Sequence, residues 1–267
     1  MTATPASSAT DHDDDTHARV PTIAPFGTYE LPVESRPVGD VKDGRRRVLC
    51  TDAAPEVMGT LVYVSSQEEP LGQSGLDRVP VVGRGTPNPN GFTINKQLYM
   101  FPLILWYAYA SELTPRLGDL AQHESDPLKR ALRTALGVGT GCGPVPDYPS
   151  SRRGCIVQVS DEIAERHRIS HALILSNHRH AGEVGHQAIV PLLRVGEHGP
   201  QPHDVHAVGP WTKLVGARPG CAVWATSMVF SIFEPEDPLG EPLFCVSNAE
   251  LQGIETALAA RGMFAVT

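Results

Sequence analysis

Short hydrophobic runs separated by turn residues make up most of this chain. Runs rich in β-branched and aromatic side chains predict strands at 59–65, 79–82, 98–109, 154–160, 171–176, 187–193 and 222–233. Clusters of glycine, proline and asparagine, as at 85–91, separate the first of these strands. A helical period occurs in only two places, so the pattern predicts a β-rich α+β fold.

Each predicted helix follows recognisable start signals. For the first, Asp126 is the expected cap, Pro127 suits the first helical position, and Gly137 marks the exit. For the last, Ser247 and Glu250 form a capping box and the helix is expected to stop at Gly262. Both helices close a series of strands.

The order of strands followed by a helix occurs twice, which predicts a tandem duplication. Gly59 and Gly154 open the matching strands 95 residues apart (154 − 59), whereas the closing helices lie about 120 residues apart. The expected organisation is a disordered tail at 1–25, a divergent domain at 26–138, a linker at 139–153, and a second domain at 154–267 with a histidine-rich insertion. The alternative is two unrelated β-rich halves.

The charge of the chain argues against a globally basic nucleic-acid-binding surface. The net charge is −8. Residues 1–20 carry four aspartates against Arg19, which is −3, so the body carries −5 (−8 + 3). Phosphate contacts would therefore need a local patch. The candidates are 45–47 and 152–153, two runs of arginine, and the alternative for both is solvated loop charge.

Cysteine usage and hydropathy predict a cytoplasmic protein that does not enter a membrane. Five cysteines form an odd set with no Cys-x-x-Cys pair, which favours reduced thiols. The longest apolar run, 98–110, is shorter than the roughly 20 residues that span a bilayer. The acidic N-terminal segment does not resemble a signal peptide.

Four segments together resemble the MazF/PemK (CcdB-like) toxin family. The matching words are Gly154-Cys-Ile-Val-Gln-Val, Ala172-Leu-Ile-Leu-Ser-Asn, Ile189-Val-Pro-Leu-Leu and Val246-Ser-Asn-Ala-Glu-Leu, in the family's order across roughly the last 115 residues. The first copy resembles the family more distantly, through 59–64, 69–82 and 113–118.

This resemblance implies two SH3-like barrel domains, each closed by a C-terminal helix, in a toxin–antitoxin protein. Family members cleave RNA without a metal, using a side-chain acid, a base and an arginine, so the implied partners are RNA or an antitoxin-like protein and no cofactor is expected. Because the family works as dimers, the tandem chain would form an internal pseudo-dimer or a homodimer.

The family's functional positions are altered here. The arginine before the proline of the second motif falls at Ser170, with His171 in place of the proline, and the threonine of the third strand falls at Leu193. In the first copy Arg78 lies one residue from the arginine position, and the threonine position is Ile104. An unchanged family site is therefore not expected.

Histidines provide a substitute for the missing acid and base. Eight of the eleven histidines lie between 167 and 206, and imidazole both donates and accepts protons near neutrality. The predicted catalytic residues are His171, Arg168 and Arg78, and the predicted RNA-binding residues are Arg166, His178, Arg179 and His180. The alternatives are an exposed polar insertion, or a metal site formed by His178, His180 and His186 or by His203 and His206, although no metal site is the expectation.

Two functions follow from these residues. The chain is either a metal-independent endoribonuclease of MazF/PemK type, or a catalytically degenerate, non-enzymatic module that binds protein or nucleic acid.

An aromatic cluster, Trp106, Tyr107 and Tyr109, is a candidate for base stacking. Strand alternation places Trp106 on one face and the tyrosines on the other, so part of this cluster is expected in the core.

Overall fold

The computed structural model describes residues 23–31, 46–50, 58–65, 78–81, 98–143, 152–167, 169–176, 185–194, 204–208, 223–226, 229–233, 239–260 and 263. The elements before residue 140 are β1 (Gly27–Leu31), β2 (Arg46–Cys50), β3 (Met58–Ser65), β4 (Val79–Val81), β5 (Leu98–Tyr109), the 3₁₀ turn η3 (Ala110–Glu112), β6 (Gly118–Asp119) and α1 (Gln122–Ala135). Those after it are β7 (Cys155–Gln158), α2 (Asp161–His167), β8 (His171–Ile174), β9 (His186–Arg194), β10 (Asp204–Val208), β11 (Val223–Thr226), β12 (Phe230–Phe233), β13 (Pro242–Cys245) and α4 (Asn248–Ala260). The predicted β-rich α+β class is confirmed.

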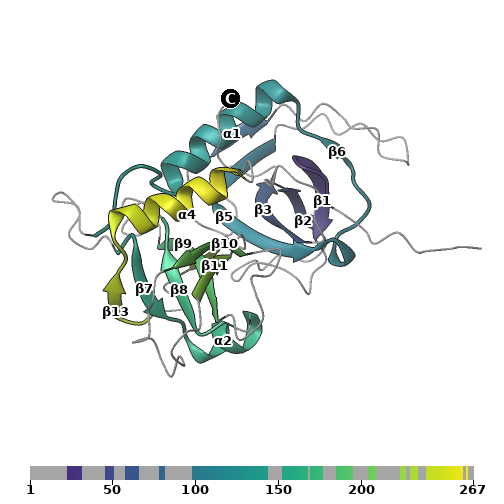
Figure 1. Ribbon diagram of the computed structural model, residues 1–267. Coiled ribbons are helices and arrows are strands. Elements are labelled where there is room, and N and C mark those ends of the chain that lie inside the picture. Colours follow the sequence, from purple (N-terminus) through teal and green to yellow (C-terminus); the bar gives the residue numbers. More distant parts are fainter. Residues whose placement is uncertain are drawn as a thin grey trace, which may run out of the picture.

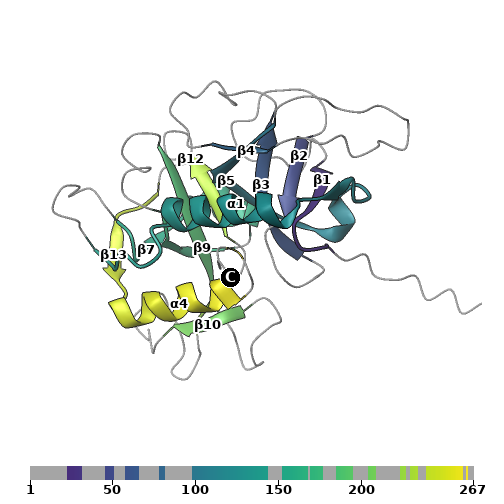
Figure 2. The same ribbon diagram turned by 90° about the horizontal axis from the view of Figure 1, so that it is seen from above.

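These strands form two antiparallel sheets (Figure 1), which meet where β5, β9 and β12 lie beside one another (Figure 2). The first sheet has the order β4-β5-β3-β2-β1-β6, and the second has the order β10-β11-β9-β8-β7-β13, with β12 also paired to β9. Every ladder among the described strands is antiparallel.

A bulge in β5 connects the two sheets. The β3–β5 register passes from Val62↔Leu105 to Tyr63↔Phe101, so residues 102–104 lie outside the regular pairing. Pro102 has no N–H to donate, which makes it a natural site for such an interruption. The hydroxyl of Ser231, in β12, accepts a hydrogen bond from the Leu105 N–H (3.0 Å) and donates one to the Leu103 carbonyl. A second-sheet side chain therefore satisfies the backbone of the first-sheet bulge.

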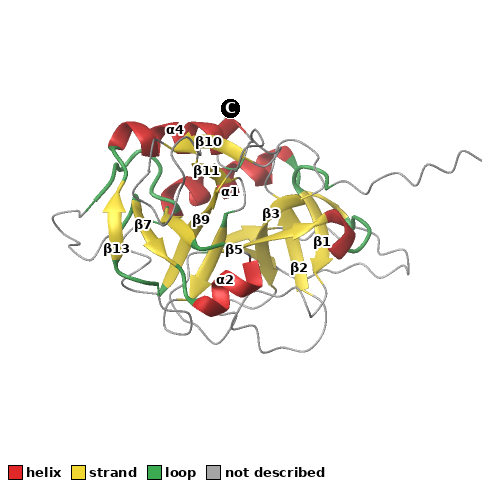
Figure 3. Cartoon of the chain, turned by 60° about the horizontal axis from the view of Figure 1, so that its bottom comes forward, coloured by secondary structure: helices red, strands yellow, loops and turns green. Residues whose placement is uncertain are grey.

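Both main core clusters combine residues from the two halves of the chain. The helix-side cluster, which contains Leu132 of α1 and Ile254 of α4, also contains Val62 of β3 and Val190 of β9. The opposite cluster contains Ile163 of α2 together with residues of both sheets. The helices α1 and α4 lie on one side of the molecule and α2 on the other (Figure 3). Burial of apolar surface thus stabilises the two halves together.

The two sheets have the same strand order. Taking β1 with β7, β2 with β8, β3 with β9, β4 with β10, β5 with β11 and β12, and β6 with β13 reproduces one sheet from the other. Each later element starts 124 to 128 residues after its counterpart, for example 128 for β7 (155 − 27), 125 for β8 (171 − 46), 124 for β13 (242 − 118) and 126 for α4 (248 − 122). The gap between β11 and β12 corresponds to the bulge in β5.

This correspondence corrects the alignment made from sequence. Matching Gly59 with Gly154 paired β3 with β7, whereas the sheet orders pair β7 with β1. The error arose because β1 is a five-residue strand with alternating burial and a weak hydrophobic signal, so the first clear strand was taken as the first strand. In the corrected correspondence, matching elements start 124 to 128 residues apart. The alignment made from sequence gave unequal separations, 95 residues for the opening strands and about 120 for the closing helices.

Helix boundaries were predicted better at α4 than at α1. At α4, the Ser247 N–H donates to Glu250 Oε2 (2.8 Å) and the Glu250 N–H donates to Ser247 Oγ (3.2 Å), which confirms the capping box. At α1, the helix begins at Gln122, where the Ala121 N–H donates to Glu124 Oε2 (3.1 Å). The predicted start at Asp126 was wrong because Pro127 lies inside α1 and not at its first helical position, so the helix contains a proline at the expense of one i→i−4 hydrogen bond.

Two further expectations change. Ile23, within the segment predicted to be disordered, is 1% exposed and belongs to the α2-side core. Trp106 is 7% exposed, as expected for a core residue, but its ring stacks against that of Tyr107 (centroids 5.9 Å apart) and both rings contact Phe230. The expectation from strand alternation, that Trp106 and Tyr107 lie on different faces, was wrong because β5 packs against β12 of the other sheet.

None of the helices in the described ranges has the length and apolar character needed to span a membrane.

Candidate functional site

A row of residues crosses the first sheet at the end where β3 finishes and β5 begins. The ladder pairs Tyr99 of β5 with Ser65 of β3 on one side and with Pro80 of β4 on the other. We call Pro80, Tyr99 and Ser65 the Tyr99 row. The guanidinium of Arg78, the residue before β4, lies over the Tyr99 ring with its Cζ 5.2 Å from the ring centroid, a cation–π contact.

The Tyr99 row faces away from the helices. The flanking residues Leu98 and Met100 belong to the helix-side core, so alternation directs Tyr99 to the opposite face. There it packs against a small aromatic cluster that contains Tyr63 and Phe101, whose ring centroids are 6.1 Å apart. Arg78 and Pro80 are exposed, and Tyr99 and Ser65 are half-buried. The row and Arg78 together therefore present a cation and a partly accessible ring above this aromatic cluster.

Strand β2 begins beside this row with Arg46 and Arg47, the last two residues of the arginine run. The ladder pairs Arg47 of β2 with Val64 of β3, and the strands continue antiparallel from there, which brings Arg46 and Ser65 to the same level. By strand register alone, Arg46 and Arg78 bracket the row from β2 and from the start of β4. Both arginines belong to positions predicted from the sequence, but no local pattern relates either of them to Ser65 or Tyr99.

His171, predicted as catalytic, lies in β8 of the second sheet. It is 8% exposed, and its ladder partner Leu192 is part of the helix-side core. Its Nδ1 is 2.8 Å from the Ser170 hydroxyl, and its Nε2 has no hydrogen-bond partner among the described residues. Burial lowers the pKa of this imidazole, which favours the neutral ring. His171 and Arg78 thus belong to different sheets.

The remaining predicted site residues are not brought together in the part of the chain that the structure describes. Arg166 belongs to α2, but its side chain lies outside the description, as do Arg168, His178, Arg179 and His180 entirely. His186 is described: it is 3% exposed in β9, and burial lowers its pKa to about 4. An imidazole with that pKa is neutral at physiological pH and is poorly matched to general acid catalysis there.

In the folded chain, the second predicted arginine patch, at 152–153, contacts backbone and side-chain groups of the protein itself. Arg152 is half-buried and donates from Nη1 to the Gly240 carbonyl (3.2 Å). Arg153 is 2% exposed; its guanidinium donates to the Leu136 carbonyl and forms an ion pair with Glu255 of α4. Buried ion pairs of this kind serve the fold, because the charge has no route to an external phosphate. The patch at 152–153 is therefore structural.

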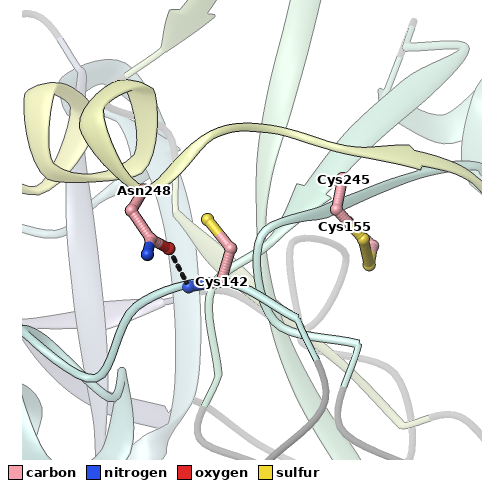
Figure 4. The surroundings of a disulfide bond; sticks show 4 residues. All are labelled: Cys142, Cys155, Cys245 and Asn248. Carbon is pink, nitrogen blue, oxygen red and sulfur yellow. Dashed lines mark hydrogen bonds between the residues drawn. A yellow bond between two sulfur atoms is a disulfide. The ribbon is translucent and has the colours of Figure 1, made fainter.

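Cysteines meet at the start of β7. Cys155 of β7 and Cys245 of β13 are cross-strand partners joined by a disulfide, so the expectation of reduced thiols was wrong for this pair (Figure 4). A separation of 90 residues hid this pairing from the sequence. Nearby, Cys142 is a free cysteine whose N–H donates to Asn248 Oδ1 (2.7 Å), and burial raises the pKa of its thiol (Figure 4).

No protein-family model and no curated protein sequence matches this chain. Among the described residues, no three or more histidine, cysteine, aspartate or glutamate side chains form a group that could hold a metal ion. The Tyr99 row together with Arg78 is a described surface that combines positive charge, a partly accessible aromatic ring and a hydroxyl side chain. Sequence reasoning missed Tyr99 and Ser65 because their proximity depends on the ladder register of β3, β4 and β5.

Proposed function

We propose that this chain is a tandem MazF/PemK-like protein, built of two SH3-like barrels, that binds single-stranded RNA at the Tyr99 row. The contact between Arg78 and Tyr99 carries the proposal. A guanidinium donates hydrogen bonds to phosphate oxygens, and a partly exposed tyrosine ring stacks with a base without reading its sequence. Arg46, at the same level of the sheet, adds a second positive charge on the other side of Ser65.

The corrected strand correspondence supports assigning the RNA site to the first copy of the duplicated unit. In the ladders, Leu173 pairs with Val190 as Leu49 pairs with Val62, so β8 corresponds to β2 with an offset of 124 residues (173 − 49). Ser170 therefore corresponds to Arg46 (170 − 124), and Leu193 of β9 corresponds to Ser65 of β3 (193 − 128). The first copy therefore carries an arginine and a hydroxyl side chain at the two family positions that the second copy has lost. These positions replace Arg78 and Ile104 in the alignment made from sequence alone.

Binding is tested by fluorescence anisotropy of a labelled single-stranded RNA with four single variants. Stacking and phosphate contacts are worth about 1–3 kcal/mol per base, so Tyr99→Ala and Arg78→Ala are expected to weaken binding by at least about fivefold. The matched controls are Tyr109→Ala, an exposed tyrosine at the other end of β5, and Arg133→Ala, an exposed arginine of α1. Equal losses in all four variants, or no RNA binding by the wild type, would refute the proposal.

Cleavage is tested separately, because a second candidate function has its own support. Burial of His171 removes the predicted second-copy acid or base from solvent, which favours a non-enzymatic RNA-binding module. Incubation of end-labelled RNA with the protein in EDTA separates the two functions. Cleavage that is lost in Ser65→Ala and in Arg46→Ala, but retained in Arg133→Ala, supports an endoribonuclease. RNA that is bound and stays intact supports the binding module.

A further inference from the structure

The bulge in β5 changes which residues share a face of the first sheet. Leu98 and Met100 belong to the helix-side core. Phe101 belongs to the aromatic cluster on the opposite face, and Tyr99 packs against that cluster. Uninterrupted alternation would direct Ile104, two pairs of residues beyond Met100, toward the helices. Instead Ile104 is 2% exposed and belongs to the same cluster as Phe101, so the bulge returns it to the face that carries the Tyr99 row.

Ser231, in β12 of the second sheet, bonds the backbone on both sides of Ile104. Its hydroxyl accepts a hydrogen bond from the Leu105 N–H (3.0 Å) and donates one to the Leu103 carbonyl. These two groups belong to the two peptide units that flank Ile104. Leu103 and Leu105 are both 0% exposed, and a buried backbone group without a partner is costly. The hydroxyl therefore favours this conformation of the bulge over others.

The strand that carries Ser231 is itself well packed. Ser231 pairs with Ala188 of β9 in the ladder, which holds β12 in the second sheet. Its neighbours Phe230 and Ile232 are 1% and 3% exposed and belong to the α2-side core. Strand β12 lies beside β5 (Figure 2). The hydroxyl is thus held in place by the second sheet and acts on the first.

We propose that Ser231 is a positioning residue for the RNA site, because it holds the β5 bulge in the conformation in which Ile104 supports the cluster beneath Tyr99. The second copy of the duplicated unit then shapes the RNA-binding surface of the first. This inference rests on the proposed function, and the ligand is the same single-stranded RNA. Without the hydroxyl, other conformations of the bulge become populated, and the apparent RNA affinity falls with the fraction of competent protein.

Anisotropy of a labelled single-stranded RNA tests this role with substitutions in the full chain. Ser231→Ala removes a partner from one N–H and one carbonyl and is expected to weaken binding about threefold to tenfold. Ser231→Thr keeps a hydroxyl and is expected to restore most of the affinity. The matched control is Ser176→Ala, which removes another buried hydroxyl, one that donates to Gln187 Oε1 (2.9 Å). Thermal unfolding of each variant checks that the fold is intact.

The results at Ser231 separate this inference from the proposed function. Wild-type affinity in a folded Ser231→Ala protein, or an equal loss in Ser176→Ala, overturns the positioning role and leaves RNA binding at the Tyr99 row standing. A double-mutant cycle tests the route: in a Tyr99→Ala background, Ser231→Ala should have little further effect on affinity. Fully additive effects would show that Ser231 does not act through Tyr99.

Hydrogen exchange of the wild type gives a readout that does not require a variant to fold. Coupling is reciprocal, so if the bonded bulge favours RNA binding, RNA must favour the bonded bulge. Saturating RNA is expected to slow exchange of the Leu105 amide at least about threefold more than that of the Gly154 amide, which donates to the Ile174 carbonyl (2.8 Å) between β7 and β8. Equal slowing of the two amides overturns the positioning role alone. Absence of RNA binding by the wild type overturns both proposals.

Discussion

Arg153, at the entry to β7, and Glu255, in α4, form a buried ion pair although 102 residues separate them. The second guanidinium nitrogen of Arg153 donates to the Leu136 carbonyl at the end of α1, and Glu255 Oε2 accepts the Gly139 N–H (3.1 Å). One arginine and one glutamate thus connect α1, the segment that follows it, β7 and α4. Desolvation lowers the pKa of Arg153, and the charge of Glu255 opposes that effect.

Removing one partner of this pair is expected to destabilise the protein strongly. Glu255→Ala leaves the Arg153 charge buried without compensation, so the free energy of unfolding should fall by about 3–5 kcal/mol in urea denaturation. Gln252→Ala, at an exposed position of the same helix, is the control and should change it by less than about 0.5 kcal/mol. A Glu255→Ala protein as stable as the control would show that the pair does not hold these segments together.

Gly154 is expected to be far less replaceable than Gly139. Both have positive φ angles, +74° and +84°, so alanine strains the backbone at either position. At Gly154 a Cβ would also lie 2.8 Å from Cys142 Sγ and 2.9 Å from its Cβ, whereas at Gly139 it would meet nothing within 4 Å. Gly139→Ala should therefore cost about 1 kcal/mol, and Gly154→Ala should cost more.

The contact with Cys142 is isolated by a double-mutant cycle. Adding Cys142→Gly to Gly154→Ala removes both sulfur and Cβ, so the excess cost over Gly139→Ala should decrease. Unfolding free energies of the four proteins from denaturant titration measure the coupling. Additive effects of the two substitutions would mean that the loop at 142 moves away without cost.

The disulfide between Cys155 and Cys245 is expected to make stability depend on redox conditions. Its closed loop spans 90 residues, and restricting such a loop in the unfolded chain is worth about 4.6 kcal/mol in the loop-entropy model. Dithiothreitol should lower the thermal midpoint of the wild type and of Cys142→Ser, but not that of a Cys155→Ser/Cys245→Ser protein. Alkylation of both Cys155 and Cys245 in protein purified without reductant would contradict this pairing.

Acid is expected to destabilise the fold through its buried histidines. The pKa of His186 is about 4 in the folded chain and ordinarily 6.5, so the unfolded chain binds more protons between these values. His186 should therefore contribute no penalty above pH 6.5 and a growing one as the pH falls toward 4, reaching about 3 kcal/mol. His171, whose pKa is lowered by burial too, acts in the same direction.

The comparison of unfolding free energies at pH 7.5 and pH 4.5 measures this contribution. His186→Gln has no imidazole to protonate, so its loss of stability between the two pH values should be about 2 kcal/mol smaller than that of the wild type. Replacing an exposed histidine, His123→Gln in α1, provides the control. Identical pH dependence in the wild type and His186→Gln would place the acid sensitivity elsewhere.

Local signals predicted the elements whose determinants lie within a few residues. The capping box at Ser247, the glycine exit at Gly137 (φ +60°) and the strands at β3, β5 and β9 follow from such short-range chemistry. The short strand β1 and the helix α2 were not predicted, because their burial comes from packing against distant residues, as for Ile163 in the α2-side core. Part of the candidate site was predicted, namely Arg78 and the arginine run at 45–47, without its relation to Tyr99 and Ser65.

By itself, the sequence determined the β-rich character of this protein, the capped helix at its end and the twofold recurrence of strands and helix, since these depend on side-chain type and periodicity along the chain. Only the tertiary structure decided which strands correspond, that Arg153 is buried against Glu255, that Cys155 pairs with Cys245, and that Arg78 lies over Tyr99. Such relationships depend on ladder register and on contacts between residues far apart in sequence, which no local pattern specifies.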